Sequence, residues 1–295
     1  MQHQQARNAG SLVVIGGNED RYHDRPVLKR IIELTEKAQP RVVIITAASA
    51  EPDFMWEAYD GAFHDLGLHH RQRLDLPDRE AANRDSSARA IREADVVFMT
   101  GGDQVRLMSA LGGSTAAAAM RDGFHNRHLC IAGTSAGASV MSDHMVAGGE
   151  AHSPPTKDMV TLAAGLGLLH GVVIDQHFSE RGRLPRLLSA VAQKPTLLGL
   201  GIDEDTALVV RPFDSIEVVG SGAVTAVDGS CMRFDCIDAH PRQALQLERV
   251  VVHLLPAGGR YHLHDCQPPG PVREQIESCG IAELVAVLTT LPPPR

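Results

Sequence analysis

The stretch Cys130-Ile-Ala-Gly-Thr-Ser-Ala-Gly-Ala-Ser139 decides the fold prediction, because an apolar run ends here in a G-x-S-x-G pattern. A serine on a sharp turn from a strand into a helix needs glycines on both sides, where the neighbouring backbone passes closely. The amide of Ala136 would then lie at a helix start, where N–H groups attract negative charge. The stretch therefore predicts a nucleophilic Ser135 with Ala136 as an oxyanion donor. An ordinary turn between a strand and a helix also fits, so the functional prediction depends on other segments.

The composition is that of an ordinary globular protein. The 295 residues are 43% hydrophobic, 22% charged and 4% aromatic. A net charge of −8 argues against a general nucleic-acid-binding function. There is no apolar leader and no run of transmembrane length, so we expect a cytoplasmic protein without a membrane partner. Five cysteines, an odd number in a large chain, predict reduced thiols rather than a disulfide framework.

Apolar runs alternate with segments of helical periodicity through the first half of the chain. Strands are expected at 11–17, 41–46, 73–76, 95–100 and 130–134, and helices near 27–34, 56–66, 86–94, 105–111 and 115–126. This alternation predicts an α/β fold with a doubly wound, mostly parallel sheet flanked by helices. Ligands bind at the carboxyl ends of strands in such sheets, so Gly16-Gly17, Gly101-Gly102 and Ser135 should meet at one edge.

The second half has a looser pattern. Strands are expected at 172–174, 197–202, 207–210, 216–219 and 250–255, with helices near 183–192 and 274–288. Short apolar runs separated by glycine turns over 215–265 predict a C-terminal antiparallel extension. The predicted organisation is a disordered tail (1–10), one α/β hydrolytic domain (11–265), and a linker with a C-terminal helix packed on that domain (266–295).

A serine nucleophile needs a base, and the base needs an orienting acid. His177 is the predicted base, because it follows the apolar run 172–174 and so lies just past a strand end. Glu204, in an acidic cluster at the end of another expected strand, is the preferred acid. Three other carboxylates remain as alternatives: Asp203, Asp175 and Glu150. Asp175, two residues from the histidine, is also a candidate to contact substrate.

The glycine pair after the expected strand at 95–100 is a second candidate for the oxyanion site. Gly102 would offer a backbone donor opposite Ala136, and Gln104 could direct its amide into the same cleft. A tight turn between a strand and a helix explains the glycines equally well, and the two interpretations do not exclude each other.

Three arginines lie within six positions next to His177, although the chain is acidic: Arg181, Arg183 and Arg186. Guanidinium groups bind carboxylates through two parallel hydrogen bonds. Cations at a helix start oppose the helix dipole, and local rules are broken most often at functional sites. The cluster therefore favours a carboxylate-rich substrate over a solvated helix start.

Five motifs occur in order over residues 11–210: Gly17-Asn-Glu-Asp20, Thr100-Gly-Gly-Asp-Gln104, Gly133-Thr-Ser-Ala-Gly-Ala138, Asp175-Gln-His-Phe-Ser-Glu-Arg-Gly-Arg183 and Gly201-Ile-Asp-Glu-Asp-Thr206. Together they resemble the cyanophycinases, in the serine peptidase group that also contains aspartyl dipeptidases and has a class I glutamine amidotransferase-like fold. The block around His177 makes the resemblance specific, because it is not a general feature of α/β folds.

The resemblance implies Ser135 as nucleophile, His177 as base and Glu204 as acid. It implies a substrate pocket shaped by Gln104, Asp175, Gln176, Arg181, Arg183 and Arg186. The implied substrate is cyanophycin, a poly-aspartate with arginine on each β-carboxyl, and the implied product is β-Asp-Arg dipeptide released from chain ends. A homodimer that needs no metal or cofactor is also implied. The sequence has Glu180 where the family pattern leads us to expect a neutral residue.

Three other functions are compatible with the sequence. The nearest is a related serine peptidase that acts on small aspartyl or isoaspartyl dipeptides. A nucleotide-binding module could use Gly16-Gly17 and Gly101-Gly102 as phosphate turns, although the chain lacks a full G-x-G-x-x-G motif and a P-loop lysine. The third is a catalytically silent relative that only binds the polymer.

Overall fold

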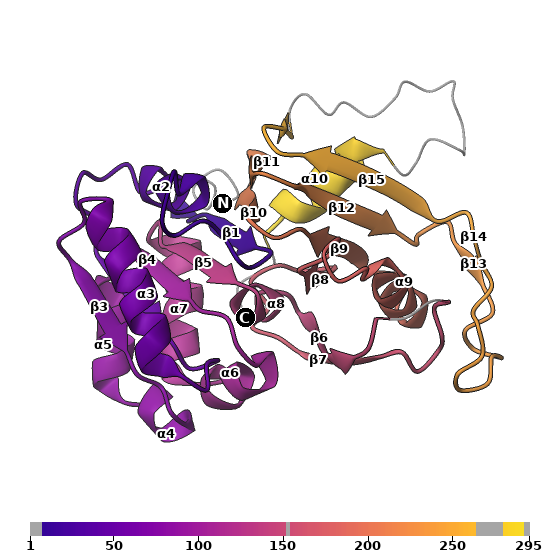
Figure 1. Ribbon diagram of the computed structural model, residues 1–295, viewed down its shortest axis with the longest axis horizontal. Coiled ribbons are helices and arrows are strands. Elements are labelled where there is room, and N and C mark those ends of the chain that lie inside the picture. Colours follow the sequence, from indigo (N-terminus) through magenta and orange to yellow (C-terminus); the bar gives the residue numbers. More distant parts are fainter. Residues whose placement is uncertain (1–7, 152–153, 264–279, 292–295) are drawn as a thin grey trace.

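The computed structural model describes residues 8–151, 154–263 and 280–291. Its largest sheet has eight strands in the order β16-β11-β10-β1-β5-β4-β2-β3 (Figure 1). Five neighbouring strands are parallel: β1 (Leu12–Ile15), β5 (Cys130–Thr134), β4 (Val96–Met99), β2 (Val42–Ile45) and β3 (Arg71–Leu74). Three strands extend the sheet in antiparallel fashion: β10 (Thr206–Arg211), β11 (Ser215–Gly220) and β16 (Arg260–His262). The predicted α/β fold with a mostly parallel sheet and an antiparallel extension is confirmed.

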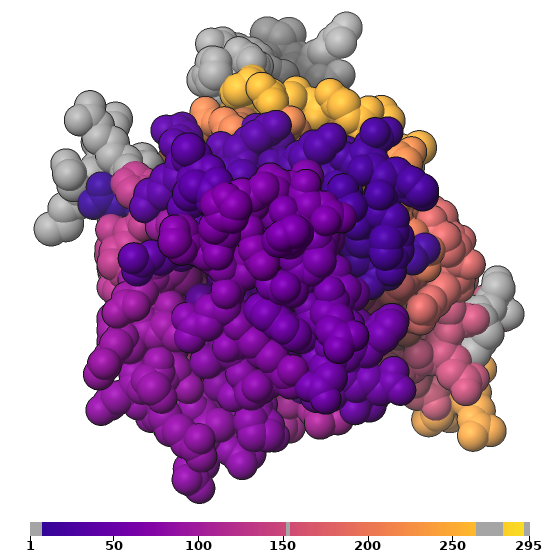
Figure 2. Space-filling model, turned by 60° about the vertical axis from the view of Figure 1, so that its left-hand side comes forward, coloured from indigo at the N-terminus to yellow at the C-terminus, as the bar shows by residue number. Residues whose placement is uncertain are grey.

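Helices cover both faces of the parallel strands, which explains why every residue of β1, β2 and β4 is buried and apolar. One face packs against α2 (Pro26–Glu33) and α3 (Pro52–Asp65). The other face packs against a second group of helices: α4 (Arg79–Ala82), α5 (Asp85–Glu93), α6 (Gln104–Leu111) and α7 (Thr115–Asn126). In the space-filling view this N-terminal half forms most of one side of the molecule, and later residues show only at its margins (Figure 2).

A second sheet of four strands, which the sequence did not predict, stands beside the first. Its order is β15 (Val251–Pro256), β12 (Ala223–Asp228), β9 (Leu198–Ile202) and β8 (Val172–Gln176). Strands β8 and β9 are parallel, and α9 (Leu184–Gln193) packs on one face of this sheet. The apolar runs mark β8, β9 and β12 as buried, but they carry no signal for the sheet to which each strand belongs.

The remaining elements are short. Strands β6 (His144–Gly149) and β7 (Val160–Ala164) form one hairpin, and β13 (Arg233–Phe234) pairs with β14 (Leu247–Glu248). Helix α8 (Ala136–Ser139) follows β5 directly. Helix α10 (Ile281–Thr289) buries Leu284, Val285 and Leu288 in the core that contains the buried side chains of β10 and β11.

Several predicted boundaries differ from the observed ones. The strand expected at 73–76 lies at Arg71–Leu74, because it is an edge strand with partly exposed polar residues and no clear apolar pattern. Asn8 and Gly10, placed in the predicted tail, hydrogen-bond through their backbones to His128 and Phe124. Residues 1–7 and the first part of the predicted linker and C-terminal helix segment, residues 266–279, lie outside the described residues. The division into domains stays a prediction.

Candidate active site

Ser135 occupies a turn between β5 and α8 that places its backbone at φ 53° and ψ −110°. Such angles are rare for a residue with a side chain and persist only where the surroundings enforce them. A Cβ at Gly133 would lie 2.3 Å from the carbonyl oxygen of Gly137, and a Cβ at Gly137 would lie 2.4 Å from that of Met99. Both flanking glycines are therefore required by close backbone contacts.

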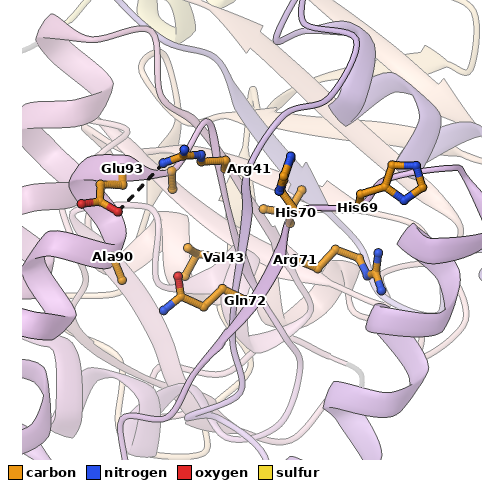
Figure 3. A pocket seen from close by; sticks show the side chains of 10 residues that line it. Arg41, Val43, His69, His70, Arg71, Gln72, Ala90 and Glu93 are labelled. Carbon is orange, nitrogen blue, oxygen red and sulfur yellow. Dashed lines mark ion pairs between the residues drawn. The ribbon is translucent and has the colours of Figure 1, made fainter.

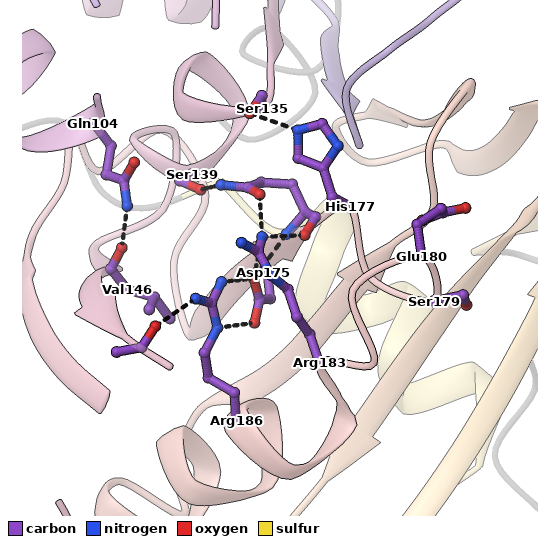
Figure 4. Close-up of polar contacts among 12 residues, drawn as sticks. Gln104, Ser135, Ser139, Val146, Asp175, His177, Ser179, Glu180, Arg183 and Arg186 are labelled. Carbon is purple, nitrogen blue, oxygen red and sulfur yellow. Dashed lines mark hydrogen bonds and ion pairs between the residues drawn. The ribbon is translucent and has the colours of Figure 1, made fainter. Parts of the chain in front are cut away.

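Three side chains from separate segments form a hydrogen-bonded line. The hydroxyl Oγ of Ser135, after β5, lies 2.9 Å from Nε2 of His177, after β8 (Figure 4). Nδ1 of the same imidazole lies 2.6 Å from Oε1 of Glu204, after β9. The line thus joins the large sheet to the second sheet at the carboxyl ends of their strands.

The electrostatics of the line favour a neutral imidazole. Burial lowers the pKa of His177 below its ordinary value; the hydrogen bond to Glu204 opposes this shift, and the positive charges of Arg181 and Arg183 add to it. Burial raises the pKa of Glu204, but hydrogen bonds from His177 and Asn18 outweigh it, so the net shift is downward. At neutral pH the line therefore contains an ionised acid and an imidazole able to accept a proton.

The other candidate acids have different partners. Asp203 accepts hydrogen bonds from the Ser179 hydroxyl at 2.5 Å and from the Ala223 amide at 3.0 Å. Asp175 binds arginines, and Glu150 is exposed. Among the described acids, Glu204 is the one whose carboxylate hydrogen-bonds to His177.

Two of the three clustered arginines are buried against this chain's own Asp175. Arg186 Nε donates to Asp175 Oδ2 at 2.8 Å, and its Nη2 also binds that carboxylate. Arg183 Nη1 lies 3.3 Å from Asp175 Oδ1 and also donates to the Gln176 side chain (Figure 4). Burial lowers the pKa of Arg183 to about 10, with Asp175 opposing the shift. Two guanidinium groups on one carboxylate leave an excess positive charge beside the site, and Arg181 remains exposed.

The two predicted amide side chains of the pocket hold neighbouring elements in place. Gln104 Nε2 donates to the Val146 carbonyl at 2.8 Å, and Gln176 Nε2 donates to Ser139 Oγ at 3.3 Å. Arg186 Nη1 also donates to the Gly149 carbonyl at 3.0 Å, so Gln104 and Arg186 both bind strand β6. The predicted pocket residues are thus linked by contacts within the protein itself.

The glycine turn after β4 adjoins Ser135. A Cβ at Gly101 would lie 3.3 Å from Cβ of Ser135. Gly102 has φ of 142°, and a Cβ there would lie 2.2 Å from the Ala48 carbonyl oxygen, so only glycine fits. Ala136, the other predicted oxyanion donor, directly follows Ser135 and is buried at the first position of α8. Both predicted oxyanion donors therefore belong to backbone close to Ser135.

The side chains of residues 18 and 19 have contacts that the sequence alone did not predict. Asn18 Nδ2 donates to Glu204 Oε2 at 2.9 Å. Glu19 is buried and accepts hydrogen bonds from Tyr59 and Thr134. The available signal was an amide and then a charged side chain, Asn18 and Glu19, directly after a buried apolar strand and two glycines. Glu180, the residue that departs from the family pattern, is exposed and accepts a hydrogen bond from the Glu204 amide at 3.2 Å.

Other features of the molecule lie away from this line. A hollow of about 290 Å³ opens at the amino ends of β2 and β3, lined by Arg41, His70 and Arg71 among others (Figure 3). It faces the opposite edge of the parallel strands from Ser135. Within residues 8–151, 154–263 and 280–291, no cluster of three or more His, Cys, Asp or Glu is arranged to hold a metal ion. None of the helices described there has the length and apolar character to cross a membrane.

Comparison with known proteins gives consistent matches. The profile of Peptidase family S51 matches residues 12–217. A cyanophycinase of Geminocystis herdmanii is 37% identical over 268 residues, covering 90% of this chain and 97% of the relative. A cyanophycinase of Trichormus variabilis is 36% identical over 256 residues, covering 86% of each chain. The crystal structure of a peptidase from an acI-B1 Actinobacterium shares the fold, with a TM-score of 0.65 and 21% identity, covering 89% of this chain and all of that chain. The chain therefore belongs to peptidase family S51.

Proposed function

We propose that this peptidase is a serine-type exopeptidase that degrades cyanophycin to β-Asp-Arg dipeptides. The observation that carries the proposal is the hydrogen-bonded line from Ser135 through His177 to Glu204. Relatives named cyanophycinase, similar over most of their length, support the substrate. An enzyme specific for small aspartyl or isoaspartyl dipeptides is not favoured by these matches.

In the proposed first half-reaction, Ser135 Oγ attacks an aspartyl carbonyl carbon while His177 Nε2 takes the hydroxyl proton. Glu204 holds the imidazole through Nδ1 and stabilises its positive charge. The carbonyl oxygen becomes an oxyanion, which accepts hydrogen bonds from the amides of Ala136 and Gly102. The C–N bond then breaks, and His177 gives the proton to the leaving amine.

In the second half-reaction, water replaces the amine. His177 takes a proton from the water as its oxygen attacks the acyl-enzyme carbonyl carbon. Collapse of this second oxyanion breaks the bond to Ser135 Oγ, which recovers its proton from the imidazole. The strained turn at Ser135 acts as a nucleophile elbow that keeps Oγ accessible from the substrate side.

The arginine cluster supports a carboxylate-bearing substrate. Arg183 and Arg186 share Asp175, so the group retains net positive charge after internal pairing. Arg181 is exposed on the same segment. We assign Arg181 to direct contact with substrate carboxylates. Arg183, Arg186, Asp175, Gln176 and Gln104 form the wall of the pocket.

The decisive experiment is incubation of the purified protein with cyanophycin and, separately, with aspartyl and isoaspartyl dipeptides. We expect mass spectrometry to detect β-Asp-Arg released from cyanophycin faster than any dipeptide is cleaved. Cleavage of the dipeptides alone would assign the protein to the alternative peptidase activity.

A homodimer and a cytoplasmic location also form part of this proposal. The first comes from the family resemblance and the second from the sequence expectation. One chain has a mass of 31.7 kDa. Light scattering coupled to size-exclusion chromatography should give twice that mass. Fractionation of cells that express the native gene tests the location.

A further inference from the structure

One loop, residues 16–20 after β1, contacts His177, Glu204 and Thr134, the residue that directly precedes Ser135. The His177 amide donates to the Gly16 carbonyl at 2.8 Å, and the Asp205 amide donates to the Gly17 carbonyl at 2.9 Å. Gly17 lies directly against the His177 ring. These contacts tie the end of a strand in the large sheet to the ends of β8 and β9 in the second sheet.

Asn18 holds the acid of the triad. Its Nδ2 donates to Glu204 Oε2 at 2.9 Å, while Glu204 Oε1 faces His177 Nδ1 at 2.6 Å. Both carboxylate oxygens therefore have a partner, which fixes the rotation of the carboxylate. Asn18 has φ of 49°, in the left-handed region that asparagine tolerates better than most residues. Position 18 thus combines a special backbone angle with a side-chain donor.

Glu19 holds the strand that leads to the nucleophile. Its side chain is buried, with 2% of the residue exposed. Oε1 accepts a hydrogen bond from the Tyr59 hydroxyl at 2.5 Å, and Oε2 accepts one from Thr134 Oγ1 at 2.6 Å. Thr134 is the last residue of β5 and directly precedes Ser135. A buried carboxylate is costly unless paired in this way, so its position is strongly determined.

We propose that the loop Gly16–Asp20 aligns the triad: Asn18 orients Glu204 towards His177, and Glu19 fixes the end of β5 that carries Ser135. This inference rests on the proposed function and deepens it. Neither side chain contacts the reacting atoms. Both are positioning residues, which act through the groups that they bind.

Asn18 is tested with two variants that suit a positive φ. Asn18→Gly keeps the backbone angle and removes the amide, so kcat should fall about tenfold with KM unchanged. Asn18→Asp also loses the donor and adds a negative charge, which raises the pKa of His177. The acid limb of its pH profile for kcat/KM should therefore move to higher pH. The other charged groups around the imidazole, Glu204, Arg181 and Arg183, are the same in both variants.

The matched control is Asn126→Asp. Asn126 Nδ2 donates to the carboxylate of Asp122 at 3.0 Å on the exposed surface of α7. The control therefore loses the same kind of hydrogen bond and makes the same change of charge, away from the site. Its kcat and pH profile should match those of the wild type.

Glu19 is tested through its partner, because substitution of a buried carboxylate endangers folding. Thr134→Val removes the hydroxyl but keeps the shape, and kcat should fall about fivefold at unchanged KM. Thr134→Ser restores the hydroxyl and should restore most of the rate. A role in stability alone would give Val and Ser variants with equal kcat once both are folded.

The activity of the wild-type enzyme distinguishes failure of the proposed function from failure of the positioning role. If it releases no dipeptide from cyanophycin, the proposed function fails. If it does, and Asn18→Gly and Thr134→Val both retain wild-type kcat, the positioning role of the loop is refuted while the function stands. A rise in KM without a fall in kcat in these variants would also overturn the positioning role.

Discussion

The imidazole of His177 occupies the space into which a side chain at Gly17 would project. A Cβ at Gly17 would lie 2.3 Å from Cε1 and 2.5 Å from Nε2 of the ring. Real Cβ atoms essentially never approach so closely, and Gly17 also has φ of 105°. The proposed base is therefore packed directly against the backbone after β1, which limits where its ring can lie.

Gly17→Ala should displace this imidazole from Ser135. We expect kcat/KM for dipeptide release to fall at least about a hundredfold, because nucleophile and base act as a unit. The matched control is Gly61→Ala in α3, where an added Cβ meets nothing within 4 Å. That variant should keep full activity and gain about 0.5–1 kcal/mol of stability, since alanine is favoured over glycine inside helices. Wild-type activity in Gly17→Ala would contradict the tight fit.

The pH dependence of kcat/KM should report the lowered pKa of His177. In the proposed mechanism the neutral imidazole is the active form. Activity should therefore rise with pH through that pKa, and the acid limb should lie below the ordinary histidine value. Arg181→Gln removes a positive charge that lowers the pKa, so its acid limb should move to higher pH. Arg89→Gln, an exposed change on α5, should leave the profile where it is. A shift of the acid limb to lower pH in the Arg181 variant would contradict the effect on the His177 pKa that we attribute to Arg181.

Glu204→Gln tests which carboxylate orients the base. The loss of the charge next to His177 Nδ1 should lower kcat by at least about a hundredfold, as in other triads that lose their acid. Glu150→Gln, at an exposed alternative, should retain wild-type kcat. The opposite ranking of these two variants would transfer the role to Glu150.

Asp175→Asn should destabilise the protein because it leaves Arg183 and Arg186 buried without their counter-charge. Breaking a buried pair in this way costs about 3–5 kcal/mol, measured as a change in the free energy of unfolding in urea. Asp122→Asn, whose carboxylate binds Arg127 at the surface, should cost less than about 1 kcal/mol. Equal unfolding midpoints for the two variants would show that Asp175 does not neutralise the arginines.

The large sheet could be predicted because its strands are buried on both faces. Runs such as Leu12–Ile15 and Val96–Met99 are continuously apolar, and the helices between them have clear periodicity. The edge strand at Arg71–Leu74 was placed two residues late because its exposed residues give no such pattern. The second sheet was missed because partner choice between β8, β9 and β12 depends on tertiary packing.

The positions of candidate-site residues could be predicted where a motif implies a particular backbone turn or strand end. Gly133 and Gly137 mark the turn at Ser135, and the strand ends locate His177 and Glu204. The partners of Asp175 could not be predicted, because sequence spacing does not show whether an arginine faces solvent or a buried carboxylate. Asn18 was missed for a related reason, since its hydrogen bond to Glu204 spans 186 positions of the chain.

The most direct test of the central claim is the rate of β-Asp-Arg release from cyanophycin by Ser135→Ala, compared with the wild type at equal concentration of folded protein. We expect a loss of at least roughly a thousandfold, because the attacking oxygen is gone while the fold and pocket remain. Near-normal release by this variant would remove Ser135, and with it the proposed acyl-enzyme, from the mechanism.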